Sequence, residues 1–224
     1  MQILLEYLKT ILKLLLGRGV VKSYSQFGED VMMQSLCKDS HGTYVDVGAY
    51  HPVLYSNTYA LYKKGWHGLV IDPNSLLKPL YALLRPQDMF IHSGVGLEEG
   101  SGTYHRFSDG AYNTFNSGTA EASKKLQRIR FLGSEECNIL PLSRIVRDAD
   151  LAEIGFLNID AEGSDLSVLH SYDWSVRPRI ISIESGEFNP DTPQKSEIYQ
   201  FLRSKNYRLV GFSGVSLLWA DSTI

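Results

Sequence analysis

The chain has 224 residues, enough for one domain with a short appendage. Hydrophobic residues make up 43% and charged residues 21%, which is the composition of a globular protein and excludes a disordered one. The net charge of −3 argues against a protein that holds nucleic acid by its charge, so we expect no nucleic-acid partner. The two cysteines, Cys37 and Cys137, lack metal-binding spacing. They exclude a zinc ribbon and a disulfide scaffold and favour a reducing, cytoplasmic location.

Residues 1–16 form a predicted amphipathic helix. A stripe of polar residues recurs at steps of three and four opposite a wide apolar face: Gln2, Glu6, Lys9 and Lys13. The segment is too short and too charged to span a bilayer, and it lacks the pattern of a signal peptide. Two interpretations stay open. The helix docks on the domain body or on a second subunit, or it lies on the inner face of a membrane, with its basic residues near the headgroups. We therefore divide the chain into an N-terminal helix, 1–22, and a domain over 23–224.

Beyond Gly17 and Gly19, segments with the patterns of strands and helices alternate. Strands are predicted over residues 43–47, 69–71, 89–92, 156–159, 180–183, 207–211 and 216–219. Helices are predicted over residues 56–63, 76–84, 165–170 and 194–204. The weakly periodic middle, 96–138, is expected to hold hairpin strands around 103–107 and a helix near 119–131. This order predicts a three-layer α/β/α sandwich with a mainly parallel sheet that ends in an antiparallel C-terminal hairpin.

The first candidate ligand loop is YVDVGAYHP, which follows the first predicted strand. Asp46 lies near the end of that strand, and Gly48 allows a ligand to approach the backbone closely. The loop lacks the three glycines of a dinucleotide fingerprint, which disfavours an NAD-dependent oxidoreductase. A turn with a single glycine suits a ligand that combines an amino acid with a nucleoside and carries no phosphate. The alternative is a simple turn between a strand and a helix.

Two further strand ends fit a nucleoside. Asp72 ends the second predicted strand and follows Gly48 by 24 residues. An acid about 20 residues beyond the glycine turn commonly accepts hydrogen bonds from ribose hydroxyls, although a turn cap is the alternative. At the end of the third strand, the small residues of the segment 92–96 leave room for a flat base.

Acidic residues follow two later strands. The segment LNIDAEGSDLSVL delivers Asp160 and Glu162 to the carboxyl edge of the sheet, and IESGE presents Glu184 at the same edge. Carboxylates at such a place are costly unless they are paired, hydrated or bound to a cation. A structural turn explains Glu162 and Asp165, but it explains Asp160 less well because that residue directly follows a buried strand.

Taken in order, five motifs resemble the FkbM-type methyltransferases. They are SQFGED at 25–30, YVDVGAYHP, the acid-Pro-Asn of 72–74, FLNIDAEGSDLSVL and the IE of 183–184. The resemblance implies a class I fold, S-adenosylmethionine as methyl donor, and O-methylation of a sugar, in surface polysaccharide or other glycan biosynthesis. The chain departs from many family members at 50–52, where it has Tyr-His-Pro in place of Asn-x-Gly.

The resemblance also implies residue roles. Asp46 and Gly48 line the methionine end of the methyl donor, and Asp72 holds its ribose. A second group flanks the adenine: Ser93, Gly94 and Val95. Gln26 and Asp30 fold back over the cleft, with capping of the following helix as the alternative.

A sugar hydroxyl needs a base, a metal ion or both to become a nucleophile. We place Asp160, Glu162 and His51 near the transferred methyl as candidate catalytic groups. Asp160 and Glu184 are candidate ligands of Mg²⁺, by analogy with other sugar methyltransferases. For His51 the alternative is a histidine bonded to backbone at a helix entry. The competing function is a non-catalytic nucleotide-binding or scaffold subunit of a glycan assembly complex.

Overall fold

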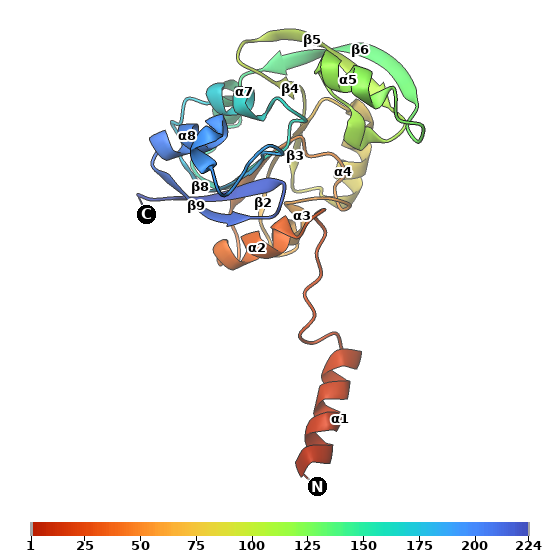
Figure 1. Cartoon of the computed structure of the whole chain (residues 1–224), viewed down its shortest axis with the longest axis vertical. Coiled ribbons are helices and arrows are strands. Elements are labelled where there is room, and N and C mark those ends of the chain that lie inside the picture. The colour runs from red at the N-terminus through yellow and green to blue at the C-terminus, as the bar shows by residue number, and fades with distance from the viewer. Residues whose placement is uncertain (1, 224) are drawn as a thin grey trace.

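The body of the protein is built on a seven-stranded sheet with the order β3-β2-β1-β7-β8-β10-β9 (Figure 1). The structure is a computed structural model that describes residues 2–223, without the side chain of Ala111. The strands are β1 (Thr43–Val47), β2 (His67–Asp72), β3 (Met89–His92), β7 (Ile154–Ile159), β8 (Pro178–Glu184), β9 (Tyr207–Phe212) and β10 (Ser216–Asp221). Five strands are parallel, and β10 runs antiparallel to both β8 and β9. The predicted parallel sheet with its antiparallel C-terminal hairpin is confirmed.

Alternating side chains divide the core into two layers, one on each face of the sheet. Val45 and Val47 pack on one face with apolar residues of α6 (Leu142–Asp148), α7 (Asp165–His170) and α8 (Glu197–Ser204). Tyr44, the residue before Val45, packs on the other face with residues of α2 (Glu29–Leu36), α3 (Tyr59–Tyr62) and α4 (Lys78–Leu84). The three-layer α/β/α sandwich is thereby confirmed. The sequence pattern did not predict α6.

From β1 the chain adds strands on one side of the sheet, β2 and β3, and then continues on the other side with β7. This reversal of strand order places a crevice at β1, between β2 and β7. Val47 pairs with Ile71 of β2 on one side and with Ile159 of β7 on the other. The carboxyl ends of the three strands therefore lie level. In open α/β sheets, ligands bind at such a reversal of strand order.

A second sheet stands at the carboxyl edge of the first, in the order β4-β6-β5 (Figure 1). It comprises β4 (Gly94–Val95), β5 (Gly100–Phe107) and β6 (Phe131–Leu140), with α5 (Ser117–Ser123) beside it. The expected hairpin is present, but the helix predicted near 119–131 ends at Ser123. Phe131 opens a strand, and its ring packs 5.5 Å from that of Phe107 across the pair.

Three one-turn 3₁₀ segments complete the body: η1 (Ser75–Leu77), η2 (Gly110–Tyr112) and η3 (Pro193–Lys195). The helix predicted over 56–63 is limited to the four residues of α3. Ser56 nevertheless acts as the expected cap, since its Oγ accepts a hydrogen bond from the Tyr59 backbone at 3.1 Å.

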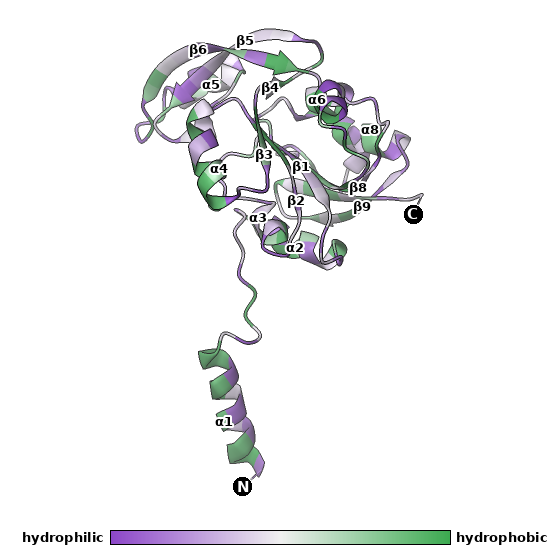
Figure 2. Ribbon diagram, turned by 180° about the vertical axis from the view of Figure 1, so that it is seen from behind, coloured by the Kyte–Doolittle hydropathy of each residue, from purple (hydrophilic) through white to green (hydrophobic). Residues whose placement is uncertain are grey.

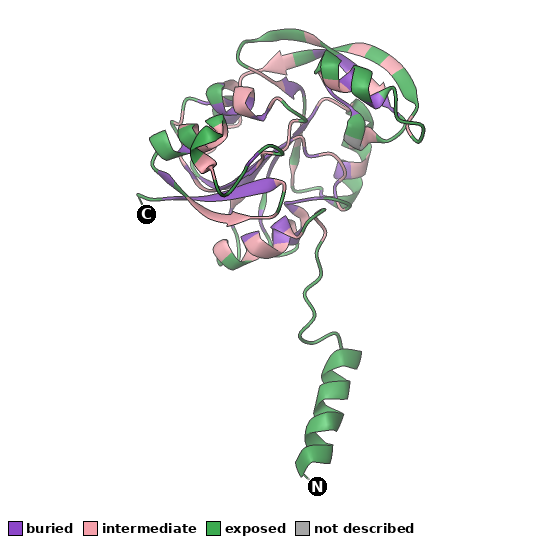
Figure 3. Cartoon of the chain, viewed as in Figure 1, coloured by how far each residue is buried: buried purple, intermediate pink, exposed green. Residues whose placement is uncertain are grey.

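The helix α1 (Gln2–Leu15) stands apart from the body, joined to it by an extended segment (Figure 1). Each of its residues is exposed (Figure 3), so it does not dock on the domain. None of the helices within residues 2–223 is long and apolar enough to cross a membrane. The division of the chain at residue 22 stays a prediction.

Candidate functional site

A cavity of about 570 Å³ opens at the carboxyl ends of β1, β2, β7 and β8. Its size lies in the range of small-molecule sites. The loop between β5 and α5 closes one side of it, and the segment before α2 contributes to another. Most of the predicted site residues line this cavity: Gln26, Asp46, Gly48, Asp72, Ser93, Gly94, Val95, Asp160, Glu162 and Glu184.

Gly48 forms the floor of the cavity where β1 meets β7. Its φ is +74°, in the left-handed region, and a Cβ atom there would lie 1.7 Å from the carbonyl oxygen of Asp160. The Gly48 backbone also donates a hydrogen bond to Ile71 of β2 at 3.0 Å. Only glycine therefore fits, and the turn brings the β1 backbone into contact with the residue that leaves β7.

Asp46 is buried in β1, two residues before Gly48. Its carboxylate accepts hydrogen bonds from Thr58 Oγ1 at 2.5 Å and from Asn158 Nδ2 at 2.8 Å. Burial raises the pKa of Asp46, while both hydrogen bonds oppose the shift. Asn57 also reaches Asn158, donating from Nδ2 at 3.1 Å. The carboxylate thus orders two amides at the cavity wall.

Asp72 ends β2 with both carboxylate oxygens held by backbone. One oxygen accepts from the Tyr50 amide at 2.9 Å, the other from the Asn74 amide at 2.8 Å. Burial raises the pKa of Asp72 to about 6. Since a carboxylate oxygen accepts more than one hydrogen bond, the group retains acceptor capacity for a ligand. The turn-cap and ligand interpretations of this acid are therefore compatible.

Ser93, Gly94 and Val95 lie along one wall, beside an aromatic side chain that the sequence did not reveal. A Cβ atom on Gly94 would lie 2.7 Å from the ring of Phe115, so the ring and this backbone are in close contact. The Ser93 hydroxyl donates a hydrogen bond to the carbonyl oxygen of Gly94 at 2.7 Å, so its proton is used within the protein. The wall suits a flat apolar group.

Three acids converge at the far end of the cavity. Burial, together with the charges of Glu184 and Glu162, raises the pKa of Asp160 well above its usual range. Glu162, at φ +48° in the turn after β7, is exposed along part of its side chain. Burial of its carboxyl group and the charge of Glu184 raise the pKa of Glu162 to about 7. A pKa near 7 suits Glu162 to accept a proton at neutral pH.

Asp165 belongs to the turn and not to the acid group. Its oxygens accept hydrogen bonds from the backbone of Ala161 at 2.8 Å and of Gly163 at 3.2 Å. This is the structural role predicted for it.

Two predicted site residues do not line the cavity. Asp30 is buried, and its carboxylate accepts hydrogen bonds from Ser23 Oγ at 2.7 Å, Ser25 Oγ at 2.8 Å and the Tyr24 amide at 2.8 Å. It fixes the chain that enters α2, while its neighbour Glu29 lines the cavity instead. His51 Nδ1 accepts from the backbone amides of residues 53 and 54, at 3.1 and 3.0 Å. It is the backbone-bonded histidine of the alternative interpretation.

The prediction of a magnesium site gains no support. Within residues 2–223, no three side chains of His, Cys, Asp or Glu are arranged to hold a metal ion. Asp160 and Glu184 are brought together, as expected, but as a pair of carboxyl groups that interact with each other.

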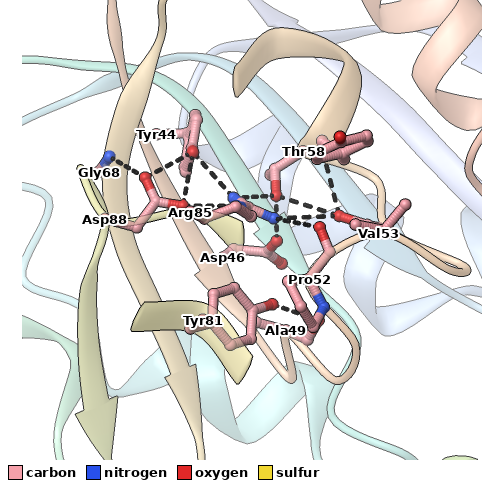
Figure 4. Close-up of polar contacts among 12 residues, drawn as sticks. Tyr44, Asp46, Ala49, Pro52, Val53, Thr58, Gly68, Tyr81, Arg85 and Asp88 are labelled. Atoms are coloured by element: carbon pink, nitrogen blue, oxygen red, sulfur yellow. Dashed lines mark hydrogen bonds and ion pairs between the residues drawn. The ribbon is translucent and has the colours of Figure 1, made fainter. Parts of the chain in front are cut away.

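Behind the cavity, a fully buried Arg85 ties the loop after β1 to α4 (Figure 4). Its Nε atom donates to Asp88 at 2.6 Å, and its terminal nitrogens donate to the Tyr44 hydroxyl at 2.8 Å and to Thr58 Oγ1 at 2.9 Å. Thr58 in turn donates to Asp46. One continuous network therefore links a buried ion pair to the cavity wall.

The sequence matches the model of the "Methyltransferase FkbM domain" over residues 46–209, which is most of the chain and contains nearly all of the cavity residues. The chain belongs to the FkbM methyltransferase family. The strand order and the antiparallel C-terminal hairpin of this chain are those of a class I, Rossmann-like methyltransferase fold.

Among solved structures, this chain is similar to methyltransferase FkbM from Methylobacillus flagellatus KT. The two share 12% sequence identity with a TM-score of 0.48. The match covers 91% of this chain and 46% of the other, so this chain spans about half of that protein's length. No curated protein matches the sequence.

Proposed function

We propose that this FkbM methyltransferase transfers a methyl group from S-adenosylmethionine to a hydroxyl group of a sugar, in the synthesis of a surface polysaccharide or other glycan. The observation that carries the proposal is the convergence of the Asp160–Glu184 pair and Glu162 beside the Gly48 turn, within one cavity. A cytoplasmic location, with contact at the inner face of a membrane, stays a prediction.

The cavity fits the methyl donor in three places. Asp72 offers acceptor capacity for the ribose hydroxyls, and the wall formed by Gly94 and Phe115 suits an adenine ring. Asp46 and the bare backbone at Gly48 leave room for the methionine portion. When bound, S-adenosylmethionine supplies an electrophilic methyl group on a sulfonium ion.

The protein's own contribution to the chemistry is alignment and proton acceptance. Methyl transfer needs the acceptor oxygen in line with the methyl group, and a walled cavity supplies that orientation. The hydroxyl proton passes to the carboxylate group formed by Asp160, Glu184 and Glu162. A base with a pKa near the working pH is both ionised and strong enough to accept a proton in the transition state. The pKa of Glu162, raised to about 7, meets that requirement, and the pKa of the neighbouring Asp160 is raised in the same direction.

The charge of the cavity lining restricts the kinds of acceptor molecule that can bind. Seven acidic residues line the cavity, and its lining within the described chain contains no lysine, arginine or histidine: Glu29, Asp46, Asp72, Asp109, Asp160, Glu162 and Glu184. A phosphate or nucleoside diphosphate group would be repelled there. This supports an acceptor that is uncharged or positively charged where it enters. Neutral glycans are therefore expected to be methylated in preference to sugar phosphates or nucleotide-linked sugars, measured with methyl-labelled donor.

Calorimetry tests the donor site. Asp72→Ala removes a charged acceptor and is expected to weaken S-adenosylmethionine binding by about 2–3 kcal/mol, or roughly 30–150-fold. Asp191→Ala, an exposed acid outside the cavity, is the matched control. Equal affinity of Asp72→Ala and the wild type would contradict the ribose assignment. Binding of NAD in place of the methyl donor would favour the oxidoreductase interpretation.

Turnover tests the chemistry. Asp160→Asn keeps the shape of the side chain and removes its charge, so methyl transfer is expected to fall by about 10²–10⁴-fold. Donor affinity should stay within about threefold, because the ribose of the donor is assigned to Asp72 and not to Asp160. Glu153→Gln, exposed before β7, is the control. Normal turnover in Asp160→Asn would reject this role for Asp160. Donor binding by the wild type without turnover on any glycan would favour the scaffold interpretation.

A further inference from the structure

The helix α1 exposes large apolar side chains that no part of the described chain covers. Its described residues are all exposed, and the apolar ones retain 52–79% of their accessible surface. In Figure 2 the ribbon of α1 carries green hydrophobic segments beside purple hydrophilic ones. The apolar residues are Ile3, Leu4, Leu5, Tyr7, Leu8, Ile11, Leu12, Leu14 and Leu15, followed by Leu16 just beyond the helix. Such a surface in water calls for a partner.

The width of the apolar face distinguishes between partners. At 3.6 residues per turn, the polar side chains of α1 occupy an arc of about 100° and the apolar ones about 200°. A two-stranded coiled coil buries only a narrow seam on each helix. Pairing with α1 of a second copy would therefore leave most of the apolar face in water. A lipid interface covers the whole of a wide face.

The charge of this part of the chain favours an anionic surface. Residues 2–22 contain four basic residues and one acidic residue, Glu6, and so carry a net charge of +3. The full chain has a net charge of −3, which leaves about −6 on the remainder. Two of the basic residues, Lys9 and Lys13, lie within the polar stripe. The basic residues following α1, Arg18 and Lys22, lie in the exposed segment that leads to the body.

The length of α1 determines how it would sit. Its 14 residues span about 21 Å, less than the roughly 30 Å hydrocarbon core of a bilayer. The helix would thus lie in the plane of the interface, with its apolar face in the acyl region and its lysines at the headgroups. Gly17 and Gly19, both at positive φ, turn the chain away from the helix axis toward the body.

We propose that α1 is an interfacial helix that binds the protein to the surface of an anionic lipid bilayer. The proposal does not depend on the methyl-transfer reaction, because it rests on α1 and the segment that follows it. The helix makes no packing contact with the catalytic body, so the body stays intact when the helix is changed.

The experiment is co-sedimentation of the full chain with vesicles of phosphatidylcholine alone and of phosphatidylcholine with phosphatidylglycerol. Binding to the anionic vesicles, weakened by salt, is expected. Leu8→Gln with Ile11→Gln should lower the partition coefficient by at least about tenfold, because each change removes apolar surface from the lipid-facing side. Thr10→Gln, on the polar stripe, is the matched control and should bind as the wild type does.

A second pair of changes tests the charge. Lys9→Gln with Lys13→Gln should weaken binding to anionic vesicles by about 30-fold, which is roughly tenfold or less for each of the two charges removed. The dependence of binding on salt should also become weaker. Thermal unfolding should be the same in every variant. Failure of the wild type to bind anionic vesicles would overturn the proposal. So would a dimer in solution that Leu8→Gln with Ile11→Gln dissociates, with no vesicle binding by the monomer or dimer.

Discussion

Replacing Gly48 by alanine tests the contact on which the cavity is built. The left-handed backbone costs an alanine about 1–2 kcal/mol. The added Cβ would lie 1.7 Å from the Asp160 carbonyl oxygen, so β1 and β7 must separate by more than an ångström. Overpacking of this kind adds about 1–3 kcal/mol. The total loss of unfolding free energy is therefore about 2–5 kcal/mol, or about 4–20 °C in melting temperature for a chain of this length.

Two other glycines separate the two contributions. Gly163→Ala, at φ +91° with open space around it, carries only the backbone cost and should lower the melting temperature by about 2–8 °C. Gly186→Ala has neither strain nor collision and should be nearly neutral. Thermal unfolding measures all three, and calorimetry should show that Gly48→Ala also loses the methyl donor. A Gly48→Ala protein as stable as Gly186→Ala would refute the close approach of β1 and β7.

Three further predictions concern buried groups. Asp88→Asn unpairs the buried Arg85 and should cost about 3–5 kcal/mol by denaturant unfolding, whereas Asp39→Asn, in an exposed ion pair, should cost at most about 1 kcal/mol. Because the folded-state pKa of Asp72 is raised to about 6, its stabilising contribution is complete below pH 4 and is lost as pH rises through 6. The unfolding free energy should fall there by about 3 kcal/mol, and less in Asp72→Asn. Phe115→Ala should weaken S-adenosylmethionine binding by about 5–150-fold in calorimetry, since stacking on a base is worth about 1–3 kcal/mol.

The central strands were predictable because they are buried on both faces. A parallel strand covered by helices on each side reads as a short apolar run, and β1, β2, β7 and β8 all do. The acids that follow these runs must then meet at the carboxyl edge. This is why Asp46, Asp72 and Asp160 could be placed in one cavity before the structure was known.

Within the accessory sheet the strand around 103–107 was predicted, but β6 was not, because it is half exposed and lies outside the main core. The sequence of β6 mixes Gly, Ser, Glu and Asn with apolar residues, and most of its positions are exposed or half-buried. Such a strand is defined by its pairing with β5 across a long connection, which local patterning does not encode. Phe115 lies in that connection, so no short-range signal could assign it to the cavity.

Neighbouring acids look alike in a sequence, and only their hydrogen-bond partners distinguish their roles. Asp30 receives three donors from the preceding turn, and Asp165 receives two from its own. Both are therefore committed to holding backbone. Asp72 accepts hydrogen bonds from the backbone and also lines the cavity, where it can accept further ones. Asp160 faces other carboxyl groups, whose charges add to burial in raising its pKa, whereas the backbone hydrogen bonds to Asp165 oppose the rise that burial causes there. That difference in partners is the physical reason to assign proton acceptance to Asp160 and its neighbours, and positioning to the others.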